Sequence, residues 1–288
     1  MSTARSDVLA GRARPGDTAG VTESAFRAGR AAGRALLVGY LPAGFPTVPG
    51  AIAAMRAMVD AGVDVVEVGL PYSDPVIDGP TIQAASDHSL RGGTRIADVL
   101  ATVEAVAATG VPTLVMTYWS PVDRYGVDRF AADLASAGGA GLITPDLVPD
   151  EAGPWLAASD AHGLDRVFLV SPSSTDARIR MTAAACRGFV YATAVMGVTG
   201  ERAAASGAAP VLVDRVRSAT GAPVVVGLGV SDGAQAAGVA AFADGVAVGS
   251  ALVRRLQDAP DDAAGVRSVA ELAAELAEGV RSATRRTA

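Results

Sequence analysis

A glutamate interrupts a largely apolar run in the first quarter of the chain. The run spans residues 63–69 (VDVVEVG) and carries Glu67 near its end. The pKa of a carboxyl buried in such a run rises because the charged form loses its hydration, and a carboxyl of raised pKa can act as a general acid or base near neutral pH. A structural ion pair or a solvated strand end would also account for Glu67, so the run alone leaves these alternatives open.

A second candidate carboxylate follows in the next segment. Residues 70–80 (LPYSDPVIDGP) contain Asp74 and Asp78, each followed by a proline or a glycine. Asp-Pro and Asp-Gly pairs are ordinary turn signals, so a turn is the simpler explanation for either residue alone. Asp78 nevertheless lies on an unusually long connection beyond Glu67, which makes it the candidate for a second catalytic carboxylate.

Two glycine-rich segments could hold a phosphate group. Residues 227–231 (GLGVS) and 245–250 (GVAVGS) each lie between an apolar run and a helical pattern. Glycine lets the backbone approach a ligand closely, and the N–H groups at a helix N-terminus bind phosphate without a lysine. The competing explanation is a pair of tight turns between strands and helices.

A third segment follows the apolar run that ends at Tyr191. Residues 196–202 (MGVTGER) place a threonine between two glycines, which suits a mobile lid over an active site. A plain flexible loop explains the same residues equally well. Tyr191 itself is equally compatible with the site and with the core of the barrel.

The scaffold that must position these candidates is indicated by eight short apolar runs that alternate with helical patterns. The runs lack apolar–polar alternation, as expected for parallel strands buried on both faces. Eight such units in this length predict a (β/α)8 TIM barrel with extra N- and C-terminal helices, and a doubly wound open sheet is the alternative. The expected strands are residues 35–40, 63–69, 111–117, 140–144, 166–170, 188–191, 223–227 and 244–248.

Two connections are longer than the others, at residues 71–93 and 193–210. The loops that follow the strands of such a barrel carry its function, so both are expected to border the active site. The chain is expected to divide into a mobile N-terminal tail, residues 1–25, and a single barrel domain, residues 26–288.

Composition excludes several classes of chemistry. All 24 basic residues are arginine, and a chain without lysine cannot form a Schiff base or the usual P-loop. Two histidines and one cysteine exclude an intrachain disulfide and suggest no metal site. The net charge of -6 argues against a nucleic-acid partner. No run suits a membrane span or a secretory signal, so a cytoplasmic enzyme that uses Asp, Glu, Tyr, Ser and backbone groups is expected.

Residues 66–83 (VEVGLPYSDPVIDGPTIQ) closely resemble the signature of the tryptophan synthase alpha chain family. The similarity extends, in the same order, over residues 33–285, and includes the segments 39–46 (GYLPAGFP), 188–191, 196–200, 227–231 and 248–250. The resemblance implies a TIM barrel of tryptophan biosynthesis. Its reaction would be the reversible, cofactor-free retro-aldol cleavage of indole-3-glycerol phosphate to indole and glyceraldehyde 3-phosphate.

The resemblance also implies a role for each matching position. Glu67 matches the general acid/base, Asp78 the second catalytic carboxylate and Tyr191 the site tyrosine. Thr199 matches the lid residue that engages the loop of Asp78 when the site closes. The implied phosphate contacts are Gly200, Gly229, Gly249 and Ser250. The implied positions near the indole ring are Tyr40, Met116, Ile143 and Leu228.

A partner subunit is part of the same resemblance. The family works as an α2β2 complex in which a beta chain holds pyridoxal phosphate and receives indole through a tunnel, so no cofactor is expected in this chain. Residues 71–78 and 119–121 are expected at the interface. Ser120, in place of a common Asn, and Ala194-Val195, in place of the Ser-Arg of some members, are departures that affect the interface and lid closure.

Two rival functions remain. Other phosphate-binding barrels use a catalytic lysine, or an early cysteine or aspartate, and this chain lacks the lysine and has its cysteine, Cys186, in an unsuitable place. A degenerate barrel that serves only as an allosteric subunit is disfavoured because both Glu67 and Asp78 are present.

Overall fold

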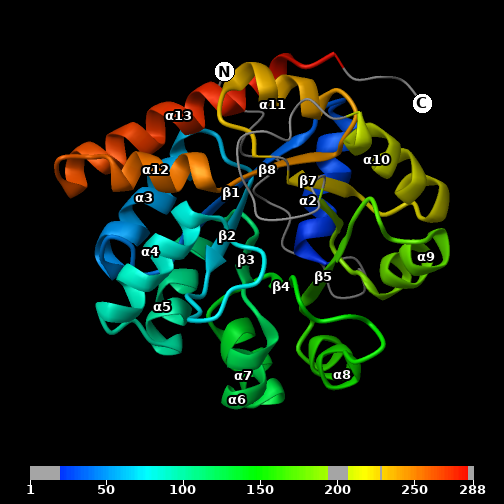
Figure 1. Ribbon diagram of the computed structural model, residues 1–288, viewed down its shortest axis with the longest axis horizontal. Helices are drawn as coiled ribbons and strands as arrows, with labels where there is room; N and C mark the ends of the chain where they lie inside the picture. Colours follow the sequence, from blue (N-terminus) through cyan, green and yellow to red (C-terminus); the bar gives the residue numbers. More distant parts are fainter. Residues whose placement is uncertain (1–19, 194–206, 228, 285–288) are drawn as a thin grey trace.

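The computed structural model describes residues 20–193, 207–227 and 229–284. Within these residues it contains a closed barrel of eight parallel strands, each hydrogen-bonded to the strands before and after it in the chain. The strands are β1 (Leu36–Pro42), β2 (Val65–Gly69), β3 (Thr113–Met116), β4 (Gly141–Thr144), β5 (Asp165–Val170), β6 (Val190–Thr193), β7 (Val224–Gly227) and β8 (Gly245–Val248). Figure 1 looks along the barrel and shows the helices arranged around it. The TIM-barrel prediction is confirmed, and the open-sheet alternative is excluded because β1 pairs with β8.

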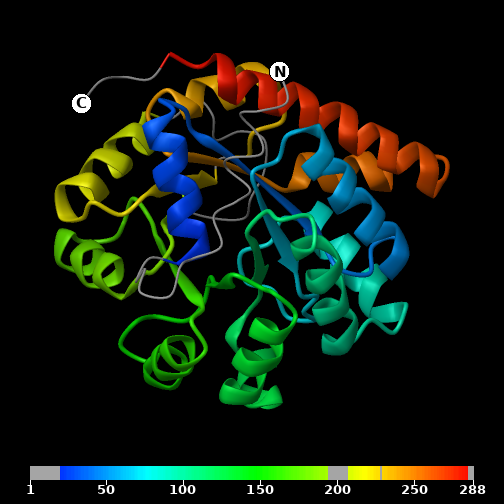
Figure 2. The same cartoon turned by 180° about the vertical axis from the view of Figure 1, so that it is seen from behind.

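Helices follow the strands in the expected places. They are α3 (Val48–Ala61), α5 (Ile96–Ala107), α7 (Val127–Ser136), α8 (Gly153–Ala161), α9 (Asp176–Ala185), α10 (Ala208–Ala219), α11 (Gly233–Ala240) and α12 (Ser250–Gln257). Side-chain caps begin several of them: Thr47 accepts a hydrogen bond from the backbone N–H of Gly50, and Asp232 accepts one from Gln235. The C-terminal helix α13 (Asp262–Ser282) packs across α3, α11 and α12, as Figures 1 and 2 show.

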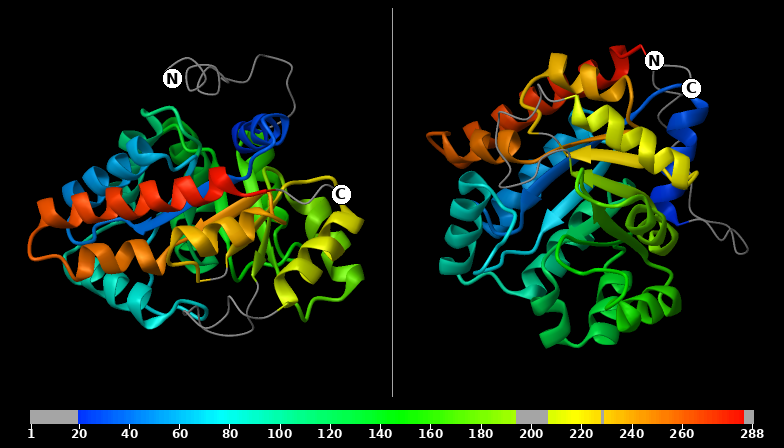
Figure 3. Two further views of the ribbon diagram at one scale, coloured as in Figure 1. Left: turned by 90° about the horizontal axis from the view of Figure 1, so that it is seen from above. Right: turned by 45° about the vertical axis from the view of Figure 1, so that its right-hand side comes forward.

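The N-terminal helix α2 (Val21–Ala31) closes one end of the barrel, where the strands begin (Figure 2 and the left view of Figure 3). The ring of Phe26 is buried and lies 5.4 Å, centroid to centroid, from the ring of Phe189. The backbone N–H of Thr22 donates to the buried carboxylate of Asp165 at the start of β5. The first end of the barrel is therefore filled, which leaves the other end for a ligand.

Strand residues alternate between the inside of the barrel and the surrounding helices. On β2, Val66 and Val68 pack into the large outer core, whereas Val65 belongs to a separate inner cluster. Glu67 shares the inward parity of Val65. The inner cluster consists of Phe26, Leu36, Val38, Val65, Leu114, Ala140, Ile143, Val167, Phe189, Tyr191, Val225 and Ala247.

Three expectations about the elements need correction. The predicted tail is too long, because α2 begins at Val21 and residues 21–25 are helical. Residues 71–93 are not one long loop, because α4 (Pro80–Arg91) occupies most of the second half. The segment at residues 119–121 is the start of a short helix, α6 (Trp119–Tyr125). No helix in the described part of the chain is long and apolar enough to cross a membrane.

Candidate active site

Glu67 points into the barrel from β2 and is almost completely buried, with 1% of its surface exposed. In the strand register it lies between Tyr40 on β1 and Leu114 on β3. Its Oε1 atom has no hydrogen-bond partner, and no ion pair with a described residue compensates its charge. Burial therefore raises the pKa of Glu67 to about 8, so the carboxyl is mainly protonated at neutral pH. This is the behaviour expected of a general acid rather than of a structural ion pair.

Asp78 lies on the loop between β2 and α4, where its backbone carbonyl accepts a 2.7 Å hydrogen bond from the side-chain amide of Gln83. Burial raises the pKa of the Asp78 carboxyl, while a hydrogen bond from the Tyr118 hydroxyl opposes that rise. Asp74, by contrast, is exposed and accepts a hydrogen bond from the neighbouring Ser73 hydroxyl. Turn chemistry therefore accounts for Asp74, whereas Asp78 lies against other polar groups of the site.

Two tyrosines stand close to these carboxyls. Burial raises the pKa values of both Tyr40 and Tyr191 well above the usual range. The next cause is the charge of Asp78, followed by that of Glu67, for Tyr40, and the charge of Glu67 for Tyr191. Glycines make room for both rings. A Cβ atom at Gly69 would lie 2.4 Å from the Tyr40 hydroxyl oxygen, and one at Gly227 would lie 2.8 Å from that of Tyr191. The structure thus brings Tyr40, Glu67, Asp78 and Tyr191 together.

Met116 and Ile143 continue the inner wall on the next two strands. Met116 is paired with Gly69 on one side and with Ile143 on the other. Ile143 is fully buried, whereas Met116 is partly exposed toward the mouth of the barrel. Together they form an apolar surface beside the two carboxyls.

The two glycine-rich segments also lie side by side, because β7 pairs with β8. Gly229 has a φ of +69°, which favours glycine, and Gly249 directly precedes α12, which begins at Ser250. A Cβ atom at Gly249 would lie 3.2 Å from the Tyr40 ring, so this segment borders the same site. Three further expected residues, Thr199, Gly200 and Leu228, lie outside the described residues.

The sequence analysis missed Tyr118. This residue directly follows the end of β3, is 5% exposed, and contacts the loop that carries Asp78. Its position just beyond an apolar run, at the same edge of the barrel as Glu67, was the signal that could have identified it.

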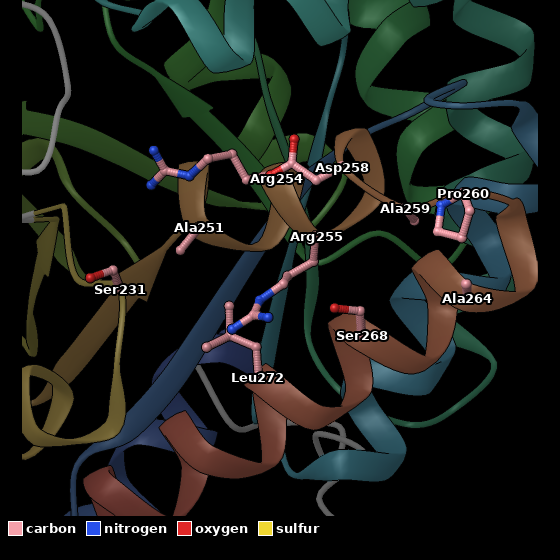
Figure 4. A pocket seen from close by; sticks show the side chains of 10 residues that line it. All are labelled: Ser231, Ala251, Arg254, Arg255, Asp258, Ala259, Pro260, Ala264, Ser268 and Leu272. Carbon is pink, nitrogen blue, oxygen red and sulfur yellow. The ribbon is translucent and has the colours of Figure 1, made fainter.

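A separate cavity of about 540 Å³ lies outside the barrel between α12 and α13. Its polar residues include Ser231, Arg254, Arg255 and Ser268, but Figure 4 shows the side chains of Arg254 and Arg255 pointing in different directions. They do not converge on one point as the groups of a ligand site do. Within the described residues, no group of three His, Cys, Asp or Glu side chains could hold a metal ion.

Comparison with known proteins shows the family of this chain. The sequence model of one family, described as the tryptophan synthase alpha chain, matches residues 26–281. The chain belongs to this tryptophan synthase alpha chain family. Its reaction is therefore the cleavage of indole-3-glycerol phosphate, a carbon–carbon lyase step of tryptophan biosynthesis.

Individual members of the tryptophan synthase alpha chain family are similar over almost their whole length. The alpha chain of Salinispora tropica is 69% identical over 258 residues, which cover 90% of this chain and 97% of that protein. The alpha chain of Streptomyces coelicolor is 62% identical and is covered to 94%. Among solved structures, tryptophan synthase of Mycobacterium tuberculosis superposes with a TM-score of 0.86 at 57% identity, and 91% of this chain covers 99% of that one. A chain from Aquifex aeolicus gives a TM-score of 0.83 at 34% identity, with 93% and 100% covered.

Proposed function

We propose that Glu67 and Asp78 divide the proton transfers of indole-3-glycerol phosphate cleavage. Breaking the bond between indole C3 and the side-chain carbon C3′ requires a proton on C3, removal of the C3′ hydroxyl proton, and stabilisation of charge at the ring N–H. The observation that carries this proposal is the buried, unpaired Glu67 carboxyl, whose pKa is raised to about 8 beside a second carboxyl. Pairs of carboxyls with different environments are a common way to separate acid and base roles.

Glu67 is the proton donor in this proposal. Because its carboxyl is mainly protonated at neutral pH, it can deliver a proton to C3 of the indole ring. The carboxylate that remains then takes the C3′ hydroxyl proton as the aldehyde forms, so the proton lost to C3 is replaced. Tyr191, whose pKa is raised by the charge of Glu67, is assigned to the same side of the substrate.

Asp78 is the ionised partner. It has a hydrogen-bond donor, Tyr118, that stabilises its carboxylate, whereas Oε1 of Glu67 has none. A carboxylate at this position can accept the hydrogen bond of the indole N–H and stabilise the positive charge that develops there on C3 protonation. Asp78 does not need to give up a proton in this role.

The rest of the substrate follows from the walls of the site. We assign the indole ring to the apolar surface of Tyr40, Met116, Ile143 and Leu228. We assign the phosphate to the backbone N–H groups of Gly200, Gly229 and Gly249, and to Ser250 at the start of α12, because one glycine-rich segment borders Tyr40 at Gly249 and the other borders Tyr191 at Gly227. Thr199 is assigned to the lid that closes toward Asp78.

A beta chain is the proposed partner. The solved structures that this chain resembles include tryptophan synthase of M. tuberculosis with an aminoacrylate bound, which supports assembly with a second, cofactor-bearing subunit. We propose an α2β2 complex in the cytoplasm. The beta chain would hold pyridoxal phosphate, since this chain has no lysine, and would receive indole. The expected interface comprises residues 71–78, where the side chain of Val76 is 71% exposed, and residues 119–121.

The kinetic test uses matched amide substitutions. Glu67→Gln and Asp78→Asn should each lower indole release by at least ~10²-fold, the lower end for loss of a general acid or base, with the circular dichroism spectrum unchanged. Asp74→Asn, in the same loop as Asp78 but exposed, is the control and should retain normal turnover. A folded Glu67→Gln enzyme with full activity would exclude the proposed mechanism.

A further inference from the structure

Tyr118 connects three points of the loop that carries Asp78. Its hydroxyl oxygen accepts hydrogen bonds from the backbone N–H groups of Val76, at 3.2 Å, and Ile77, at 3.1 Å. The hydroxyl also interacts with the carboxyl of the next residue, Asp78, and this interaction opposes the rise in the pKa of Asp78 and raises the pKa of Tyr118. A tyrosine hydroxyl has one donor and two acceptor positions, so both acceptor positions are used on consecutive residues of one loop and the O–H remains available to the next residue, Asp78.

Tyr118 is held through its ring and through the backbone that follows it. Its centroid lies 5.2 Å from that of Tyr72, on the same loop as Asp78. The next residue, Trp119, donates its backbone N–H to both carboxylate oxygens of Asp146, at 2.9 and 3.1 Å. Asp146 follows β4, so Tyr118 is attached to the rigid barrel independently of the loop it holds.

We propose that Tyr118 is a positioning residue that holds the Asp78 carboxylate where its catalytic role requires it. The inference rests on the catalytic role proposed for Asp78. Ser73, Asp74 and Val76 of the same loop are exposed, so the loop has little apolar packing of its own there. A buried hydroxyl that accepts hydrogen bonds from the two backbone N–H groups directly before Asp78, and interacts with its carboxyl, fixes the path of the loop where it carries that side chain.

The same hydrogen bond favours the ionised form of Asp78, because an O–H donor stabilises a carboxylate more than a carboxylic acid. Loss of the hydroxyl should therefore raise the pKa of Asp78 further above its usual range. At a given acidic pH a smaller fraction would be ionised, so the acidic limb of the pH–rate profile should move to higher pH. A residue that merely supports the fold would lower thermal stability without moving that limb.

Tyr118→Phe tests the proposal, since it removes only the hydroxyl. We expect kcat for indole release to fall by about 10- to 100-fold, the loss expected for a hydrogen bond to a charged group, with a much smaller change in KM and the acidic limb moved to higher pH. Tyr125→Phe is the matched control: the Tyr125 hydroxyl also donates to an aspartate, Asp133 at 2.6 Å, on the outer helices. Its kinetics should be those of the wild type. A Tyr118→Phe enzyme with normal kcat and an unmoved limb would overturn the inference.

A double-mutant cycle separates this inference from the proposed function. If Tyr118 acts through Asp78, adding Tyr118→Phe to Asp78→Asn should cost little more activity; losses that multiply would contradict the inference. Normal turnover in Asp78→Asn would refute the proposed function itself, whereas an impaired Asp78→Asn beside a normal Tyr118→Phe would refute only the positioning role. If Tyr118→Phe fails to fold, 3-fluorotyrosine at position 118 provides a second variant. As a stronger donor, it should move the acidic limb to lower pH, and an unmoved limb would contradict the inference.

Discussion

Glu67 and Asp78 differ in what surrounds their carboxyl oxygens. Glu67 lies inside the barrel with an unpartnered Oε1, and its pKa is raised to about 8, whereas Asp78 lies on a loop and keeps a donor, Tyr118. The raised pKa of Glu67 was predictable because the residue interrupts an apolar run. The contact between Asp78 and Tyr118 was not, because it joins residues 40 positions apart that only barrel closure brings together.

The buried Glu67 carboxyl should also affect stability. Its pKa in the folded chain, about 8, lies above that of an unfolded glutamate, 4.5. Folding therefore favours the protonated form: its contribution is fully present below pH ~4.5 and is lost as pH rises through about 8. Glu67→Gln keeps the neutral form, so its unfolding free energy relative to wild type should increase over this interval, by a few kcal/mol at most.

Urea unfolding at a series of pH values measures this difference. Glu104→Gln, on the exposed face of α5, is the control and should follow the wild type. A Glu67→Gln curve parallel to that of the wild type from pH 5 to 8 would show that burial of Glu67 does not shift its protonation.

The strands and most helices were predictable because their sequence patterns are strong. Apolar runs buried on both faces identified all eight strands, and a helix end such as Gly62, with a φ of +123°, was marked by its glycine. Helix α4 was missed because its buried face includes Ser86 and Ser89, so it lacks a continuous apolar stripe. Helix α6 was missed because it has only seven residues.

Helix α2 should be an integral part of the barrel. Its Phe26 ring is 1% exposed, packs on Phe189, and occupies the space that a side chain at Gly245 would need. Phe26→Ala should lower the unfolding free energy by about 3–5 kcal/mol, as expected for truncation of a buried aromatic residue. Urea denaturation followed by circular dichroism measures the loss. Arg27→Ala, whose side chain is 61% exposed, should change stability by less than about 0.5 kcal/mol. A Phe26→Ala loss below about 1 kcal/mol would mean that α2 is not required to close the barrel.

Across the whole molecule, one end of the barrel is closed and the other carries the candidate active site. Helix α2 fills the end where the strands begin, while Glu67, Asp78, the two tyrosines and the glycine-rich segments gather toward the other. The closed barrel was predictable from the regular alternation of runs and helices. Which loop residues meet at the end that carries the candidate active site was not, because the turn signals around Asp74 and Asp78 are alike and only the fold separates them.

The beta-chain interface is proposed for the segments that hold the carboxylate. Asp78 lies at one end of residues 71–78, and Trp119 directly follows Tyr118. A partner docked on both segments would therefore contact the loop of Asp78 and the residues that hold it by hydrogen bonds. Docking and positioning of Asp78 should then be coupled. Coupling free energies between sites are usually 1–3 kcal/mol, which corresponds to about a 5- to 150-fold change in affinity, and a change of similar size in turnover is expected.

Indole release from indole-3-glycerol phosphate, measured with this chain alone and during titration with its cognate beta chain, tests the central claim most directly. We expect the chain alone to release indole slowly. We also expect turnover to rise about 5- to 150-fold and to saturate as the complex forms, and the Glu67→Gln chain to remain nearly inactive throughout. No indole release by the chain in either condition, or equal release by Glu67→Gln, would contradict the account of this barrel as a lyase that acts through its buried carboxyl.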